Sequence, residues 1–411
     1  MSSGEILVVP KNGQGHLFPS MQLCKHLISR NYTITLIVDS DITSSIPSSL
    51  LQSPLFQLTH ISTGSGPSQP FHRNHQQMGH GIETLLARRD PNSTRPVCAI
   101  VDHIMSKTQE VFSRFGVPTV VFITSGACWA AVQHAVWVVR PGDMTPGEVR
   151  VLPGLPEEMV LKYSDLKQRR HWRPPPAKEV EKDPKGGMKP PRGPPLPGEP
   201  APWVEEVECS AAILINTCDD LERPFLDYVA KLTQKPVWGV GPLLPDQYWQ
   251  STDSLLRERE IRPRKESNYT EDEIIEWLDQ QPRGSVMYVS FGSEVGPTME
   301  EYPELAGALE ESTRPFIWVI QRKSAPQHSG QPGLGGVEAQ EHLKVGTMVS
   351  EGYPDDKVKK SDILHGIEKV LTDGDIRSQS EILRGQFEQG FPASSLASLD
   401  AFKDLINQKA A

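Results

Sequence analysis

A histidine in the first part of the chain is the first residue whose type and position suggest chemistry. The apolar segment Ile6–Val9 has the character of a buried strand, and Gly13, Gly15 and His16 follow it. Glycine lets the backbone turn sharply off a strand, so His16 is expected at the start of the next helix. A helix N-terminus favours the neutral imidazole, which can accept a proton. His16 is therefore a candidate general base, although spacing alone fits a loop histidine without a role better.

Asp102 is the candidate partner of that histidine. It closes a second apolar run, Val97–Val101. The carboxyl ends of parallel strands line the crevice where α/β domains bind ligands, so Asp102 and His16 are predicted to face the same cleft. An aspartate that accepts the Nδ1 proton would fix the imidazole tautomer and stabilise the imidazolium. Capping of the next helix is an alternative role for Asp102, and the residues alone do not decide between the two.

A third candidate site is the turn at the end of Tyr288–Ser293. Gly292 permits close backbone approach, and Ser293 with neighbouring amides could hydrogen-bond a phosphate oxygen. The turn alone is weak support, since any strand–helix connection can carry one. His72, His75 and His80 also invite a metal site, but their Gly-, Asn-, Gln- and Arg-rich surroundings predict a loop with exposed histidines. No metal is expected.

The elements that must position these residues follow a βαβ rhythm. Strand-length apolar runs alternate with amphipathic stretches, which predicts a doubly wound α/β domain. A helix is expected between the first two runs, because apolar residues from Leu17 to Ile28 recur every three or four positions. The predicted strands are Ile6–Val9, Thr33–Val38, Phe56–Ile61, Val97–Val101, Thr119–Ile123, Ala211–Asn216 and Pro236–Val240.

A length of 411 residues predicts two domains. We expect an N-terminal domain at 1–244 with a proline-rich loop at 173–203, a linker at 245–268, a second α/β domain at 269–393 and a terminal helix at 394–411. The second domain has strand patterns at Ser285–Ser290 and Phe316–Gln321 around a helix at Met299–Glu311. After about residue 322 only helices are predicted, at Lys357–Thr372, Ile376–Phe387 and Ser394–Gln408. An open parallel sheet normally has four or more strands, so the second domain is predicted to be incomplete.

The amino-acid composition narrows the classes of partner that this protein is expected to bind. The formal net charge of −10 disfavours nucleic acid, which requires a concentrated basic surface. The five cysteines are odd in number and widely spaced, as in a protein with reduced thiols. The N-terminal residues show no signal-peptide pattern, and no apolar run is long enough to cross a membrane. We therefore expect a cytoplasmic protein without membrane insertion that binds small molecules.

Taken together, these segments resemble the plant family 1 UDP-glycosyltransferases. Each match is modest, but they occur in the family's order over most of the chain, and the tail Leu343–Ala411 resembles the family's C-terminal helices. The matching segments are Gly15–Pro19, Val97–Asp102, Thr124–Ala127, Ile215–Glu222, Trp238–Pro242, Trp277–Pro282 and Gly284–Ser293.

The family's hallmark is a long box that begins W-x-x-Q, continues through H-x-G-W-N-S and an acidic residue, and ends in D-Q. It holds the uracil, ribose, diphosphate and sugar of the donor. None of its parts occurs in this sequence, which runs from Gln340 directly into Glu341 between pieces that resemble regions flanking the box. We predict that most of the donor-binding box is missing, through a skipped exon, a gene-model error or gene decay.

The resemblance implies twin Rossmann-like domains of the GT-B type, the second one truncated here. It implies a monomer that transfers a sugar, with glucose expected, from a UDP-sugar to a hydroxyl of a flavonoid, other phenolic or terpenoid, with inversion and without a cofactor or metal. His16 and Asp102 would be catalytic. Gly15, Thr124 and Ser125 would contact the acceptor, and Gly292 and Ser293 the donor.

Two other functions remain open. The chain could be a catalytically inactive paralogue or a mis-spliced product, because the loss of strands together with ligands would cost more than the ~5–15 kcal/mol of stability that a domain has. An NAD-dependent oxidoreductase is the second alternative. Asp39, at the end of the second strand, would suit a ribose, but Phe18 stands where the dinucleotide fingerprint requires its third glycine.

Overall fold

The computed structural model describes residues 3–40, 46–63, 71–90, 93–140, 143–166, 201–245, 248–249, 268–291, 297–320, 342–349 and 357–410. Contacts divide the chain into two compact units. The first unit consists of Met1–His134, Pro200–Arg264 and Arg384–Ala411, and the second of Ala135–Glu199 and Lys265–Leu383. The proline-rich loop and the linker lie almost wholly outside the described residues, and the predicted domain boundaries remain predictions.

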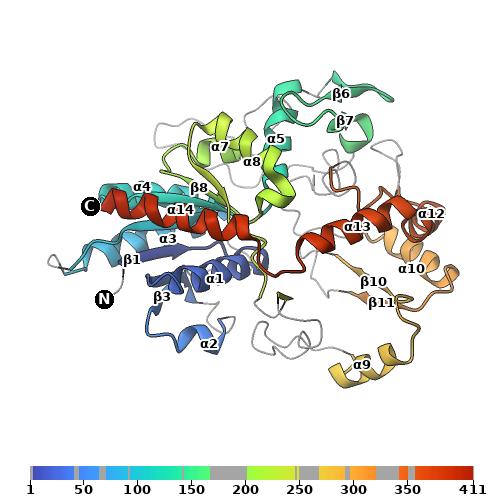
Figure 1. Cartoon of the computed structure of the whole chain (residues 1–411), viewed down its shortest axis with the longest axis horizontal. Coiled ribbons are helices and arrows are strands. Elements are labelled where there is room, and N and C mark those ends of the chain that lie inside the picture. The colour runs from blue at the N-terminus through green and yellow to red at the C-terminus, as the bar shows by residue number, and fades with distance from the viewer. Residues whose placement is uncertain are drawn as a thin grey trace. The chain divides into compact units, whose positions relative to one another are not determined.

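The first unit is built on a seven-stranded sheet in the order β3-β2-β1-β4-β5-β8-β9, and every strand pair in it is parallel (Figure 1). The strand order reverses at β1, which places β4 next to β1. All seven predicted strands of this region are confirmed. They are β1 (Glu5–Val9), β2 (Thr33–Asp39), β3 (Phe56–Ile61), β4 (Cys98–Asp102), β5 (Thr119–Ile123), β8 (Ile213–Ile215) and β9 (Val237–Gly239).

The central strands β1, β2, β4, β5 and β8 are buried on both faces, which explains why they read as nearly continuous apolar runs. Successive side chains point to opposite faces, so Ile6 and Val8 enter one core while Leu7 and Val9 enter the other. The first core also holds α1 (Gln14–Ile28) and the end helix α14 (Ala393–Ala410), which runs beside the strands in red in Figure 1. The second core holds α3 (Phe71–Ala87) and α4 (Gln109–Arg114).

The helix α3 corrects the expectation of a loop around His72, His75 and His80. Met78, Ile82 and Leu86 recur every four residues and pack on the sheet, with exposed fractions of 6% or less. Gly81 allows this approach, because a Cβ there would lie 2.3 Å from Ile61 Cγ2. His75 is buried rather than exposed. Gly81, one of the glycines that suggested a loop, therefore serves the close packing of a helix on a strand.

The remaining elements of the first unit connect or flank the sheet. Among the described residues of the whole chain, no helix combines the length and apolar character needed to cross a membrane. The elements that connect or flank the sheet of the first unit are α2 (Ser48–Leu51), the 3₁₀ helix η2 (His103–Thr108), α5 (Ala127–Val139), which continues past the unit boundary, α7 (Pro202–Glu206) and α8 (Asp219–Thr233).

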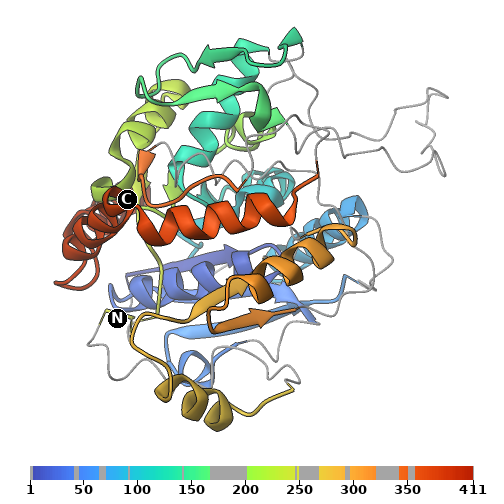
Figure 2. The same ribbon diagram turned by 90° about the vertical axis from the view of Figure 1, so that its right-hand side faces the viewer.

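In the second unit, β10 (Met287–Ser290) and β11 (Phe316–Val319) form a parallel pair, drawn in orange next to α10 (Glu301–Glu311) in Figures 1 and 2. The two predicted strands and the helix between them are confirmed. Within the described residues, no third strand joins this pair. Other elements are the antiparallel hairpin β6 (Val149–Val151) and β7 (Val160–Lys162), η4 (Tyr163–Leu166), α9 (Glu271–Asp279), α12 (Lys360–Thr372) and α13 (Gly374–Gln386).

Candidate active site

His16 is placed by the turn between β1 and α1. Gly13 caps α1 with a φ of 128°, a backbone conformation that favours glycine, and the amide of His16 donates to the Gly13 carbonyl at 3.1 Å. His16 is the third residue of α1, and the hydroxyl of Ser20 donates to its carbonyl at 2.8 Å. The histidine therefore stands in the first turn of a helix, above the carboxyl end of β1, as the sequence predicts.

Asp102 lies next to His16 because β4 pairs with β1, with Val101 beside Val9. Its Oδ2 is 2.7 Å from His16 Nδ1, and the residue is 1% exposed. Its other oxygen, Oδ1, accepts the amide of Ile104 at 3.0 Å and caps η2. The aspartate thus fills both of the roles that the sequence left open, partner and helix cap, each with a different oxygen.

The charge of Asp102 is stabilised despite its burial. Burial raises the pKa of the carboxyl, but the hydrogen bond with His16, the neighbouring His103 and the amide of Ile104 outweigh it, so the pKa is lowered from its usual value. An ionised carboxylate can only accept a hydrogen bond, so Nδ1 of His16 carries the proton that lies between them. Nε2 of His16 then has a free lone pair and can accept a proton.

Thr124 is a third residue of this cluster, whose members come from the carboxyl ends of the neighbouring strands β1, β4 and β5. It follows β5, which pairs with β4, and its Oγ1 lies 3.1 Å from His16 Nδ1. Ser125 Oγ is buried and has no hydrogen-bond partner among the described residues. Gly15 is exposed, and no atom of the described residues lies within 4 Å of the place where a Cβ would stand. The structure therefore brings Asp102 and Thr124 into direct contact with His16. Ser125 and Gly15 are the sequence neighbours of Thr124 and His16.

His103 is a neighbour that sequence reasoning missed. Its Nδ1 is 3.5 Å from Asp102 Oδ1, and its ring lies 6.1 Å from that of His16 and edge-on to Trp129 at 5.4 Å. Burial lowers the pKa of His103 to about 4, although the carboxylate of Asp102 opposes the shift. His103 is therefore neutral near pH 7 and adds no positive charge beside His16. Its position directly after the strand-end aspartate was the one signal in the sequence.

Glu206 at the end of α7 is a second residue that the sequence did not single out. Burial raises the pKa of its carboxyl to about 8, and the negative charge of Asp102 adds to the shift, while Lys107 opposes it. A carboxyl with this pKa is mostly protonated near neutral pH, so Glu206 adds little negative charge beside Asp102 there. Such shifts are typical of functional sites but also occur in structural clusters.

The sequence of this chain is similar to those of plant UDP-glycosyltransferases. No protein-family model matches the chain. UDP-glycosyltransferase 73C1 of Arabidopsis thaliana is 25% identical over 345 residues, covering 77% of this chain and 63% of the relative. Mogroside I-E synthase of Siraitia grosvenorii is 26% identical over 327 residues, covering 78% and 67%. The chain is related to the plant UDP-glycosyltransferases.

Solved plant UDP-glycosyltransferases share the fold along nearly the whole chain. UGT73P12 of Glycyrrhiza uralensis, complexed with glycyrrhetinic acid 3-O-monoglucuronide, has a TM-score of 0.73 at 16% identity, covering 99% of this chain and 96% of its own. UGT71G1 of Medicago truncatula, complexed with UDP-glucose, has a TM-score of 0.64 at 17% identity, covering 99% and 98%. The predicted GT-B fold is confirmed. The chain spans 63% of the length of the first relative.

The two residues predicted to contact the donor lie outside the described residues. Gly292 and Ser293 follow β10 but are not among the described residues, and neither is the junction of Gln340 and Glu341. Their predicted roles, and the predicted loss of the donor-binding box, remain predictions. Among the described residues, no group of three or more His, Cys, Asp or Glu side chains is arranged to hold a metal ion.

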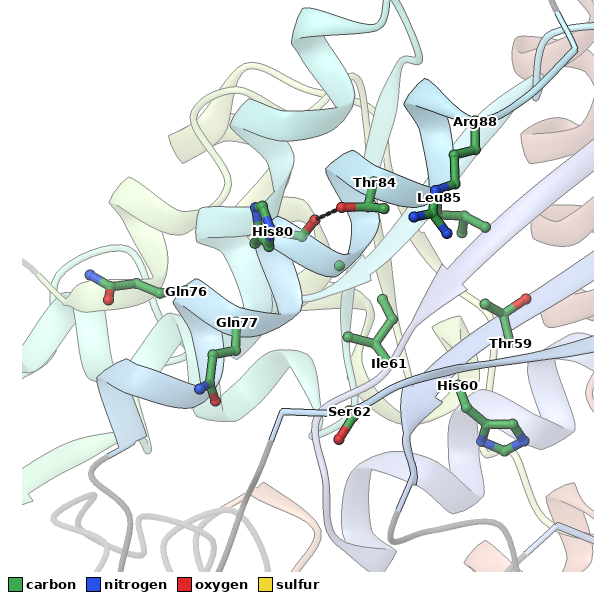
Figure 3. A pocket seen from close by; sticks show the side chains of 11 residues that line it. Thr59, His60, Ile61, Ser62, Gln76, Gln77, His80, Thr84, Leu85 and Arg88 are labelled. Carbon is green, nitrogen blue, oxygen red and sulfur yellow. Dashed lines mark hydrogen bonds between the residues drawn. The ribbon is translucent and has the colours of Figure 1, made fainter.

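A cavity of ≈ 600 Å³ lies elsewhere in the first unit, between β3 and α3 (Figure 3). It is lined by Thr59–Ser62 on the strand side and by His80, Thr84 and Arg88 on the helix side. Thr84 donates to the carbonyl of His80 at 3.0 Å, within the helix itself. Because β3 is separated from β1 by β2, and neither His16 nor Asp102 lines this cavity, it is distinct from the His16 site.

Proposed function

We propose that this chain is a UDP-sugar-dependent glycosyltransferase that transfers a sugar, with glucose expected, to a hydroxyl of a small plant metabolite such as a flavonoid, other phenolic or terpenoid. The observation that carries the proposal is the 2.7 Å contact between His16 Nδ1 and the buried carboxylate of Asp102. Relationship to the plant UDP-glycosyltransferases supports it.

In the proposed reaction, Nε2 of His16 accepts the proton of the acceptor hydroxyl while the hydroxyl oxygen attacks the anomeric carbon of the donor sugar. The new carbon–oxygen bond forms as the bond to the β-phosphate oxygen breaks, and UDP leaves with the bonding electron pair. Attack from the face opposite the leaving group inverts the anomeric carbon. Asp102 stabilises the imidazolium formed on His16, as a carboxylate does for a catalytic histidine.

The other predicted site residues have supporting roles in this proposal. Thr124 lies against His16, and with Gly15 and Ser125 it would contact the acceptor beside the base. Gly292 and Ser293 would contact the diphosphate through backbone amides and a hydroxyl, which act in place of a metal. The chain would work as a monomer in the cytoplasm, with the acceptor and the UDP-sugar as its small-molecule partners and without nucleic acid, membrane insertion or a cofactor.

The test combines donor binding with turnover. The purified full chain is titrated with UDP-glucose by calorimetry and then incubated with UDP-glucose and a panel of flavonoid and triterpenoid alcohols, with UDP release and product mass as readouts. We expect micromolar binding, glycoside formation and an inverted anomeric centre by proton NMR. The His16→Asn variant should bind donor normally and release UDP much more slowly, whereas Asp227→Asn, an exposed substitution on α8, should match the unaltered protein.

An inactive paralogue is the second candidate, and one observation favours it. The two-stranded sheet of the second unit leaves large apolar side chains exposed, with Tyr288 at 67% and Phe316 at 38%. A folded protein that binds no UDP-glucose and releases no UDP would support this candidate. Binding of NADH in the same calorimeter would instead support a dinucleotide-dependent enzyme, which is disfavoured by Phe18 at the position of the fingerprint's third glycine.

A further inference from the structure

The segment Asn216–Glu222 joins β8 to the first turn of α8 and lies beside the turn that carries Thr124. Strand β8 pairs with β5, with Ile215 beside Ile123, so the residues that follow the two strands are neighbours. Thr124 is the first residue after β5 and Asn216 the first after β8. Two polar side chains of this segment hold the turn that carries Thr124.

Asn216 holds the front of that turn. Its Nδ2 donates to the carbonyl of Thr124 at 3.1 Å, and its Oδ1 accepts the amide of Leu243 at 2.8 Å. Its own backbone amide donates to the carbonyl of Ile123 at 2.9 Å. One side chain therefore connects the turns that follow β5 and β9, and it uses both its donor and its acceptor to do so.

Glu222 holds the back of the same turn. The residue is 1% exposed, and its two carboxylate oxygens accept the amides of Ala127 at 2.6 Å and Cys128 at 3.1 Å, which are the first residues of α5. A carboxylate at a helix N-terminus is stabilised by the free amides and by the helix dipole. Gly126 is required there, because a Cβ at that position would lie 2.5 Å from Glu222 Oε1.

The backbone of Glu222 is fitted to this contact. Inside α8 it has φ −135° and ψ 28°, which is not helical, and Pro224 follows two residues later. This local kink interrupts the helix at the residue whose side chain reaches α5. A buried carboxylate with two amide partners is costly to disturb. The turn is therefore held at one end by Asn216 and at the other by Glu222.

We propose that Asn216 and Glu222 are positioning residues that hold Thr124 Oγ1 at 3.1 Å from His16 Nδ1 and thereby fix the direction of Nε2. The inference rests on the proposed function. With Asp102 as its single partner, the imidazole could pivot about that hydrogen bond. The Thr124 hydroxyl oxygen is a second oxygen within hydrogen-bond distance of His16 Nδ1, and a rigid turn holds it there. This second contact restrains the ring, so that the lone pair of Nε2 keeps one direction.

The test uses graded variants of the full chain. Glu222→Gln keeps one acceptor oxygen for the two amides, whereas Glu222→Ala keeps none, so the second should have the larger effect. Asn216→Asp keeps the acceptor for Leu243 but loses the donor to Thr124. Misplacement of a catalytic group by about 1 Å can cost about 100-fold in rate, so we expect kcat to fall by about 10- to 100-fold with little change in KM. Thr124→Val should lower kcat to a similar extent, and combining it with Glu222→Gln should lower kcat little further.

A second readout requires no substrate. In protein labelled with ¹⁵N-histidine, the His16 ring signals, identified by their loss in His16→Asn, should broaden or shift in the Glu222 and Asn216 variants and stay unchanged in Asp227→Asn. Variants that lower the melting temperature while the His16 signals and kcat per folded molecule stay unaltered would overturn the inference. Absence of all transferase activity with the expected His16 changes would refute the proposed function and leave the positioning role standing.

Discussion

Replacement of Asp102 by asparagine is the sharpest perturbation of the proposed general base. The substitution keeps the size of the side chain but replaces a carboxylate by a carboxamide. An asparagine can turn its NH₂ group toward His16 Nδ1, which would then act as the acceptor and leave the proton on Nε2. His16 could no longer take a proton from an alcohol, and the imidazolium would lose its counter-charge.

The magnitude follows from the contact geometry. At the observed 2.7 Å and an effective dielectric constant of about 20, Coulomb's law gives about 6 kcal/mol for two unit charges. Both charges are spread over several atoms, and the His16 side chain is 19% exposed, so we take about 4 kcal/mol. That energy corresponds to a rate reduction of about 10³-fold. A His16 tautomer with its proton on Nε2 would lower the rate further.

The assay measures kcat by UDP release, alongside the His16 tautomer by two-bond ¹H–¹⁵N correlation in the protein without substrate. Asp39→Asn is the matched control, because Asp39 is also a 1% exposed aspartate at the carboxyl end of a strand, β2. We expect the control to lower stability and to change kcat by less than about tenfold. A folded Asp102→Asn protein with the original tautomer and a kcat within about tenfold of normal would refute the general-base assignment.

Three further substitutions test the packing and charges around the site, each by urea unfolding followed by tryptophan fluorescence. Because the pKa of Glu206 is raised from 4.5 to about 8, its stabilisation is complete below pH 4.5 and is lost as the pH rises through 8, so Glu206→Gln should remove that loss. The pKa of His103 is lowered from 6.5 to about 4, so its stabilisation is present above pH 6.5 and about 3 kcal/mol is lost as the pH falls to 4; His103→Phe should lose less. Phe402→Ala, in the core beside Trp238, should cost about 3–5 kcal/mol, and a cost below about 1 kcal/mol would contradict the packing.

The sheet of the first unit was predictable largely because its central strands are buried on both faces. In β2, for example, Ile34, Leu36, Ile37 and Val38 supply apolar side chains to both faces, so the segment stands out from the polar turns around it. The candidate pair was predictable for a related reason. The carboxyl ends of all parallel strands lie at one edge, so a histidine after β1 and an aspartate ending β4 had to share that edge, and the pairing of β1 with β4 then brought them into contact.

Other features depend on packing that no local pattern reveals. The segment of α3 was misjudged because Gly79 and Gly81 suggest a loop, whereas Gly81 serves the close approach of the helix to Ile61. His103, Glu206 and Glu222 were missed because their importance comes from burial and, for Glu206 and Glu222, also from partners distant in the chain. Glu222, for example, accepts amides from residues 94 and 95 positions away. Gly292 and Ser293 lie outside the described residues, so their predicted roles stay predictions.

The arrangement of the candidate base separates two requirements of the proposed glycosyl transfer. His16, Asp102 and Thr124 follow or close three adjacent strands of one sheet, and Asn216 and Glu222 belong to the same unit. The tautomer of His16 is therefore set by the core of the first unit. Binding of a sugar nucleotide would depend on residues after β10, in the second unit, where the described sheet that contains β10 has two strands. Loss of donor-binding residues would leave the base in place, so a correct His16 tautomer without UDP release would locate the defect on the donor side.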